Sequence, residues 1–170
     1  IDGPAHLGLI AGRGLYPLAL AEGARSEGVD RITAVAFSGE TDRRLDGLVD
    51  DVTWIRVGQL GRMLETLRQS GVHEAVMAGQ VTPTKLFRVR MDTPMRALLK
   101  NLPVRNAETI FGAIGDQLAE IGIALLPASR FMESAMPGAG CLTERTPSDA
   151  ERVDIELGMR VAKSTSRLDV

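Results

Sequence analysis

The chain has 170 residues, of which 44% are hydrophobic and 25% are charged, values that are ordinary for a globular protein able to bury a core. Its 20 Lys and Arg residues nearly balance its 22 Asp and Glu residues, so the chain lacks the strong positive field of a typical nucleic-acid binder. The length suits one domain, or one domain and part of another.

Cysteine usage and hydropathy indicate a cytoplasmic protein. Cys141 is the single cysteine, so no internal disulfide can form, and a reducing compartment fits. No apolar stretch approaches the ~20 residues needed to span a bilayer. No charged and then apolar leader precedes the first predicted strand.

The first half of the chain alternates between apolar runs and helical patterns. Residues 7–11 form a short, fully apolar strand of the kind buried in parallel sheets, and Pro17 suits the first position of a helix that ends near Gly28. Leucines and methionine at helical spacing after Gly58 predict a second helix. Further strands are predicted at 31–37, 52–57 and 74–81.

The second half continues this alternation and then changes in composition. Asn106 is a good N-cap for a helix with an apolar stripe, which runs from Ile110 to Ile121. After Met136 the chain is rich in Gly, Pro and small polar residues, as linkers are, and Ser148 or Asp149 can cap a last helix. The other predicted elements are a helix at 93–102, a strand at 123–128 and a short helix at 129–135.

Alternating strands and helices predict an α/β fold with a mainly parallel sheet and helices on both faces. We expect a first domain at 1–135, a linker at 136–148, and the start of a second, truncated domain at 149–170. One helix and a few extended residues cannot form a core of their own.

Two glycine-marked strand ends are the candidate binding loops, because ligands of parallel sheets lie beyond the carboxyl ends of the strands. The first loop offers backbone N–H groups and the positive end of a helix dipole, although Pro17 breaks the dinucleotide-binding fingerprint. The alternative for each loop is an ordinary turn without a ligand. The candidate residues are Gly12, Arg13, Gly14, Leu15, Tyr16 and Pro17 in the first loop, and Gly79, Gln80, Val81 and Thr82 in the second.

The residues alone show no catalytic grouping. The two histidines, His6 and His73, lie in different segments, and Cys141 lies in the predicted linker. Asp92 and Asp169 are more typical of caps or surface charges than of metal ligands. One basic run is either a solvated face or a site of attraction to an anionic lipid or phosphate: Arg88, Arg90, Arg96, Lys100 and Arg105.

Several stretches, in order and over nearly the whole chain, resemble the LpxI family of UDP-2,3-diacylglucosamine pyrophosphatases of lipid A synthesis. They are LGLIAGRGLYPLALAEGA, VGQLGRMLETLRQSGV, EAVMAGQVTPTKLF, NAETIFGAIGDQLAEIGIALLPA, LTERTPSDAERVDIELGMRVAKS and RLDV. Each stretch is loosely similar to the family, and the series together is fairly specific.

The resemblance implies a Rossmann-like first domain and a distinct α/β second domain, with the substrate held between them. It implies hydrolysis of the pyrophosphate bond of UDP-2,3-diacylglucosamine to UMP and the acylated sugar phosphate, with a divalent metal, usually Mg²⁺. The family's acidic catalytic residues lie mostly beyond Val170, so none is assigned here. The nucleotide-facing side maps to the two glycine loops, with Asn106 and Thr109 at the cleft.

The expected partner is therefore a UDP-linked acylated glucosamine, with transient contact to the inner membrane surface and a homodimer as further possibilities. Many family members have an acidic pair where Asn106 begins its helix, and Arg-Pro where this chain has Thr82-Pro83. A non-catalytic nucleotide-binding or regulatory module is the alternative function. A Rossmann-type oxidoreductase is a third, with Glu40 as the acidic residue nearest the end of the second strand.

Overall fold

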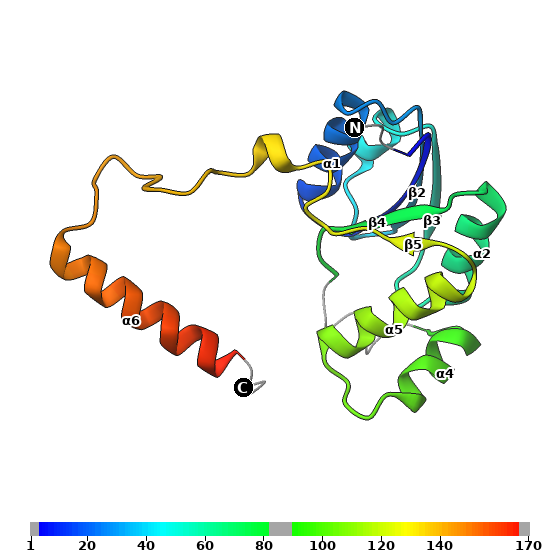
Figure 1. Ribbon diagram of the computed structural model, residues 1–170. Helices are drawn as coiled ribbons and strands as arrows, with labels where there is room; N and C mark the ends of the chain where they lie inside the picture. The colour runs from blue at the N-terminus through cyan, green and yellow to red at the C-terminus, as the bar shows by residue number, and fades with distance from the viewer. Residues whose placement is uncertain (1–3, 82–89, 167–170) are drawn as a thin grey trace. The chain divides into compact units, whose positions relative to one another are not determined.

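The computed structural model describes residues 4–81 and 90–166 (Figure 1). The predictions made for Thr82, Pro83, Arg88 and Asp169 lie outside the described residues. Tertiary contacts divide the chain into two compact units, Ile1–Ser134 and Ala135–Val170, which are described separately below.

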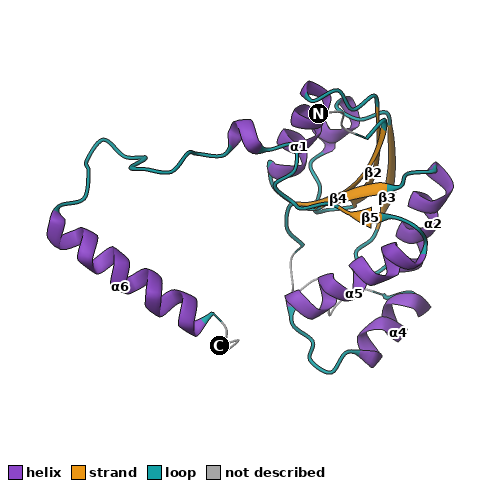
Figure 2. Ribbon diagram, viewed as in Figure 1, coloured by secondary structure: helices purple, strands orange, loops and turns teal. Residues whose placement is uncertain are grey.

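The first unit is built on a five-stranded sheet in the order β3-β2-β1-β4-β5, in which every neighbouring pair is parallel (Figure 2). β1 lies at the centre, and the chain leaves it toward β2 on one side and later returns to β4 on the other. The carboxyl ends of β1 and β4 are therefore a topological switch point, where open α/β sheets bind ligands. The strands are β1 (His6–Ala11), β2 (Arg31–Phe37), β3 (Asp51–Ile55), β4 (Glu74–Ala78) and β5 (Ala124–Leu125).

Helices cover both faces of this sheet, which confirms the predicted α/β class (Figure 1). Successive residues of a strand point to opposite faces, so Leu9 packs into the cluster that contains α1, and Ile10 into the cluster that contains the other three helices. These helices are α1 (Tyr16–Ser26) on one face, and α2 (Leu60–Ser70), α4 (Thr93–Asn101) and α5 (Ala107–Glu120) on the other.

Several elements differ from their predicted bounds; β3, for example, ends at Ile55 rather than at residue 57. β4 ends at Ala78 rather than at residue 81, because Gly79 takes a positive φ of 87° and turns the chain away from the sheet. β5 has two residues rather than six, since it is an edge strand and Pro127 cannot donate a further backbone hydrogen bond. Only a 3-10 turn, Glu133–Ala135, forms where a short helix was predicted at 129–135.

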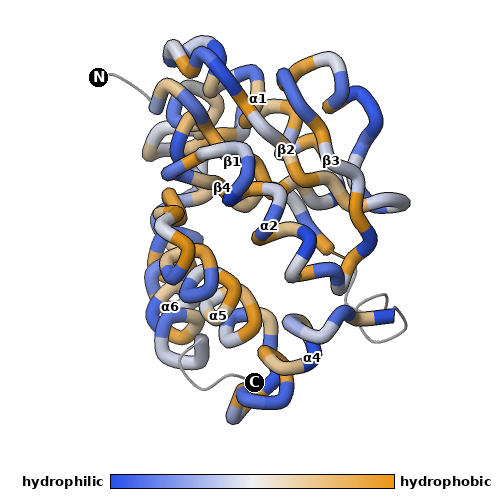
Figure 3. The backbone as a smooth tube through the Cα atoms, turned by 90° about the vertical axis from the view of Figure 1, so that its right-hand side faces the viewer, coloured by the Kyte–Doolittle hydropathy of each residue, from blue (hydrophilic) through white to orange (hydrophobic). Residues whose placement is uncertain are grey.

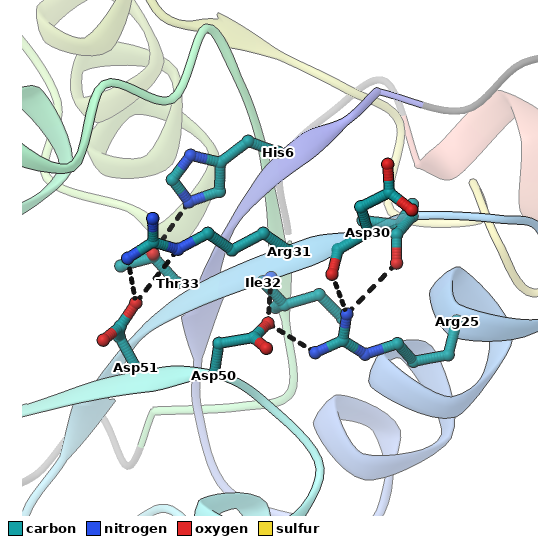
Figure 4. Close-up of polar contacts among 9 residues, drawn as sticks. His6, Arg25, Asp30, Arg31, Ile32, Thr33, Asp50 and Asp51 are labelled. Carbon is teal, nitrogen blue, oxygen red and sulfur yellow. Dashed lines mark hydrogen bonds and ion pairs between the residues drawn. The ribbon is translucent and has the colours of Figure 1, made fainter.

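The amino ends of β1, β2 and β3 are joined by charged side chains (Figure 4). Arg31 donates to Asp51 at 2.8 Å, and His6 Nε2 lies 2.8 Å from Thr33 Oγ1. Burial lowers the pKa of His6, and the charge of Arg31 lowers it further. These contacts fix the register of the sheet at the edge opposite to the predicted binding loops.

The second unit contains α6 (Asp149–Thr165), which begins at Ser148 as predicted. Ser148 and Glu151 form a reciprocal capping box, and the Arg145 guanidinium lowers the pKa of Glu151 to about 2. No residue of α6 is buried. Within residues 4–81 and 90–166, no helix combines the length and the hydrophobicity that crossing a membrane requires.

Candidate functional site

The structure brings the two predicted glycine loops together at the carboxyl edge of the sheet. The Gly12 amide donates to the Ala78 carbonyl at 2.8 Å. Arg13 and Gln80 exchange two backbone hydrogen bonds, at 2.6 and 3.0 Å, and form an antiparallel bridge. The loops that follow β1 and β4 are therefore one connected unit.

The close approach of the two loops explains two of the glycines. A Cβ at Gly12 would lie 2.5 Å from the Gln80 carbonyl oxygen, and a Cβ at Gly79 would lie 2.7 Å from the Arg13 carbonyl oxygen. Both positions leave no room for a side chain. The Gly12 and Arg13 amides already have protein acceptors, so these glycines serve contact between loops.

The start of α1 is the part of the first loop that stays open. Gly14 has a φ of 102°, and a Cβ there would meet nothing within 4 Å. Leu15, the N-cap residue, makes no side-chain capping bond and is 68% exposed. Tyr16 Oη donates to the Ala128 carbonyl at 2.6 Å and so ties this loop to the segment after β5. Any anion bound by the first loop would have to contact this open side.

A pocket of about 310 Å³ opens beside the carboxyl ends of β1, β2 and β4, with α5 and the start of α2 as its walls. Apolar side chains from these elements dominate its surface, among them Phe37, Met63, Met77, Ile110 and Phe111. The further lining residues are Ile10, Gly12, Val57, Gly58, Gln59, Leu60, Ala78, Gly79, Val81, Met95, Arg105, Asn106, Ala107 and Ile114.

Four of the predicted site residues line this pocket: Gly12, Gly79, Val81 and Asn106. Thr82 lies outside the described residues. The remaining predicted residues do not line the pocket; they are Arg13, Gly14, Leu15, Tyr16, Pro17, Gln80 and Thr109. Their role in substrate binding stays a prediction.

Asn106 and Thr109 form a capping box at the start of α5. The Asn106 side chain accepts from the Thr109 amide at 2.8 Å, and Thr109 Oγ1 donates to the Val104 carbonyl at 2.6 Å. This structural role accounts for the two residue types at this spacing.

Polar side chains interrupt the apolar lining of the pocket at Gln59, before α2, and at Arg105, before α5. Arg105 donates through Nε to the Leu99 carbonyl at 3.0 Å, and its two terminal nitrogens have no carboxylate partner in the described part of the chain. The Gln59 Oε1 atom accepts from the Arg56 amide at 2.7 Å, which leaves its NH₂ group directed elsewhere. Arg105 and Gln59 are therefore the candidate polar contacts of a pocket ligand.

The sequence patterns did not identify the apolar wall of the pocket. Ile110 and Ile114 belong to the predicted stripe, which we interpreted as core. Phe111, beside that stripe, is 47% exposed and lines the pocket. The sequence signal that could have indicated this wall was Phe111 itself, a large aromatic residue adjacent to the apolar stripe of the helix.

The Mg²⁺ implied by the resemblance, expected to be bound mainly by the second domain, stays a prediction. No group of three or more His, Cys, Asp or Glu side chains in 4–81 or 90–166 is arranged to hold a metal ion. Asp92, one of the isolated carboxylates, instead caps α4 by accepting from the Met95 amide at 2.9 Å. We therefore assign no metal ligands in this part of the chain.

The model of a family described as the LpxI N-terminal domain matches residues 6–135, and a search of curated proteins found none that matches the chain. The match is to an N-terminal domain alone. The predicted function was hydrolysis of the pyrophosphate bond of UDP-2,3-diacylglucosamine by an enzyme of which this chain is a truncated part. That prediction is wrong as an assignment to this chain, because the match is to an N-terminal domain only and confirms no pyrophosphatase activity. Since the matched residues are most of the 170, the chain belongs to the LpxI family, which groups it with hydrolases of lipid A biosynthesis.

Proposed function

We propose that this N-terminal domain is a ligand-binding domain for a UDP-linked acylated glucosamine and that an acyl chain occupies the pocket beside β1 and β4. The observation that carries the proposal is the apolar character of that pocket at the switch point of the sheet. A nucleotide base or a diphosphate would need several polar partners, whereas a hydrocarbon chain needs only apolar walls.

The size of the pocket suits part of an acyl chain. At ~30 Å³ for each water-sized group, about 310 Å³ holds roughly ten such groups. Burial of hydrocarbon stabilises by about 0.8 kcal/mol per CH₂, so half a dozen buried methylenes would contribute on the order of 5 kcal/mol before the costs of association. An acyl group can therefore dominate the affinity.

The polar groups of the ligand would contact Arg105 and Gln59, which both line the pocket. The terminal guanidinium nitrogens of Arg105 suit an anionic oxygen, and the Gln59 amide suits a sugar hydroxyl or an amide-linked acyl carbonyl. Residues 14–16 are exposed at the start of α1, where backbone amides of a helix N-terminus would offer a second anion contact.

Calorimetric titration of the 170-residue chain tests the proposal. UDP-linked diacylglucosamine should bind more tightly than UMP, which lacks the acyl chains. Ala107 lines the pocket, and Ala107→Trp should fill it and weaken binding of the acylated ligand at least tenfold. Glu108 is exposed and outside the lining, so Glu108→Trp is the matched control and should leave binding unchanged. Equal binding of UMP and the acylated ligand, or an equal effect of the two substitutions, would contradict the proposal.

A further inference from the structure

Residues 90–106, which comprise α4 and the segments on either side of it, carry more positive than negative charge. Arg90, Arg96, Lys100 and Arg105 lie on or beside α4, and none of them forms an ion pair within the described ranges. The one carboxylate of this segment, Asp92, accepts backbone hydrogen bonds from two amides. Residues 90–106 therefore hold four cations and one carboxylate.

Several arginines elsewhere in the unit do pair, although Arg13, Arg56 and Arg62, like the cations of 90–106, have no ion pair within the described ranges. Arg25, Arg31, Arg68 and Arg130 each contact a carboxylate. On α4, Arg96 and Lys100 are four residues apart, so they share one face of the helix, and both are exposed. These two side chains are available to an external anion.

Exposed apolar side chains adjoin the cations. Val104 is 53% exposed and Phe111 is 47% exposed, which is high for large hydrophobic residues. Figure 3 shows hydrophobic residues along α5, next to α4, and contacts between the two helices place them side by side. Arg105 and Phe111 also line the pocket, so the charged and apolar surface is continuous with it.

We propose that this surface, made of Arg96, Lys100, Val104, Arg105 and Phe111, docks on a lipid bilayer that contains anionic headgroups. Basic side chains attract such a surface, and exposed apolar residues beside them enter the interface between headgroups and acyl chains. Charge complementarity selects this occupant, because residues 90–111 hold four cations and two carboxylates, Asp92 and Glu108, and so carry a net charge of +2 in a chain whose net charge is −2. The docked surface would bring the pocket opening to the depth of the acyl chains.

This proposal rests on the proposed acyl-binding function, but binding of the chain to a bilayer is measured separately from binding of the ligand. Cosedimentation of the chain with phosphatidylcholine vesicles, with and without phosphatidylglycerol, is the assay. Binding should require phosphatidylglycerol and should weaken as NaCl shortens the Debye length from ~10 Å at 0.1 M. Equal binding to both vesicle types, or no binding to either, would overturn the proposal.

Substitutions identify the surface. Arg96→Gln combined with Lys100→Gln should weaken vesicle binding about 30-fold, which corresponds to ~2 kcal/mol at about 1 kcal/mol per cation. Arg152→Gln combined with Arg160→Gln removes the same charge from exposed positions on α6 and should have no comparable effect. Equal losses for the two pairs would refute this surface. Arg96 and Lys100 lie outside the pocket lining, so Arg96→Gln combined with Lys100→Gln should keep binding of the UDP-linked ligand in the absence of vesicles, and failure of docking and failure of the pocket assignment are therefore distinguishable.

Discussion

Alanine substitutions at three glycines separate close approach from backbone conformation at the paired loops. At Gly12, φ is not positive, but a Cβ would lie 2.5 Å from the Gln80 carbonyl oxygen. At Gly14, φ is 102° and the space around a Cβ is open. Gly79 combines both restrictions, with a φ of 87° and a Cβ that would lie 2.7 Å from the Arg13 carbonyl oxygen. An L residue in the left-handed region costs about 1–2 kcal/mol. Movement of the backbone would also weaken the two hydrogen bonds between Arg13 and Gln80, at about 1 kcal/mol each.

We therefore expect Gly14→Ala to lower the free energy of unfolding by about 1–2 kcal/mol, Gly12→Ala by ~2 kcal/mol, and Gly79→Ala by about 3–4 kcal/mol. Urea denaturation followed through the fluorescence of Trp54, the single tryptophan and a residue of β3, measures each value in the first unit. If Gly14→Ala is as costly as Gly79→Ala, the close approach of the loops has no energetic weight and the reasoning fails.

Three further predictions concern stability. Gly23→Ala should destabilise the chain, because the new Cβ would lie 2.0 Å from the Phe131 carbonyl oxygen. Ala in a helix interior is normally more stable than Gly by about 1 kcal/mol. Gly112→Ala, which has open space around the new Cβ, should therefore stabilise the chain by about that amount. Asp92→Ala should cost about 2–3 kcal/mol, since it removes a helix cap and leaves a second amide, on α2, without its acceptor. The folded state lowers the pKa of His6 below 6.5, so stability should fall as the pH drops below that value, and His6→Gln should reduce this fall.

Urea denaturation also measures these three effects, and for each of them one result would contradict the prediction. A stabilising Gly23→Ala would show that α1 can move away from the segment after β5. An Asp92→Ala variant as stable as Thr93→Ala, which changes the residue next to the N-cap, would show that the cap contributes little. A stability that rises between pH 6.5 and 5.5, after correction with His6→Gln, would reverse the inferred sign for His6.

The sheet and its helices could be predicted because their signals are local. The apolar run that became β1, the helical spacing after Gly58 and the Asn106 cap each specify an element from a few neighbouring residues. Where a nonlocal contact decides the outcome, the prediction missed. The strand at 74–81 stops at Ala78 because Gln80 pairs with Arg13, which is far away in the sequence.

The candidate site was predictable in position and not in chemistry. Both glycine loops lie at the carboxyl edge of the sheet, as their place after strands requires. The sequence could not show that the Gly12 and Arg13 amides are used between the loops. Nor could it show that Phe111 faces a cavity, because helical periodicity does not separate a core contact from a pocket wall.

The central claim is that the pocket beside β1 and β4 binds an acyl chain, and a comparison of two ligand affinities tests it most directly. The affinity of the chain for UDP-linked diacylglucosamine is compared with its affinity for UDP-linked glucosamine without acyl chains, in the wild type and in Ala107→Trp. We expect the acylated ligand to bind at least tenfold more tightly to the wild type and this preference to disappear in the variant. A preference that survives Ala107→Trp unchanged would show that the acyl chain binds elsewhere.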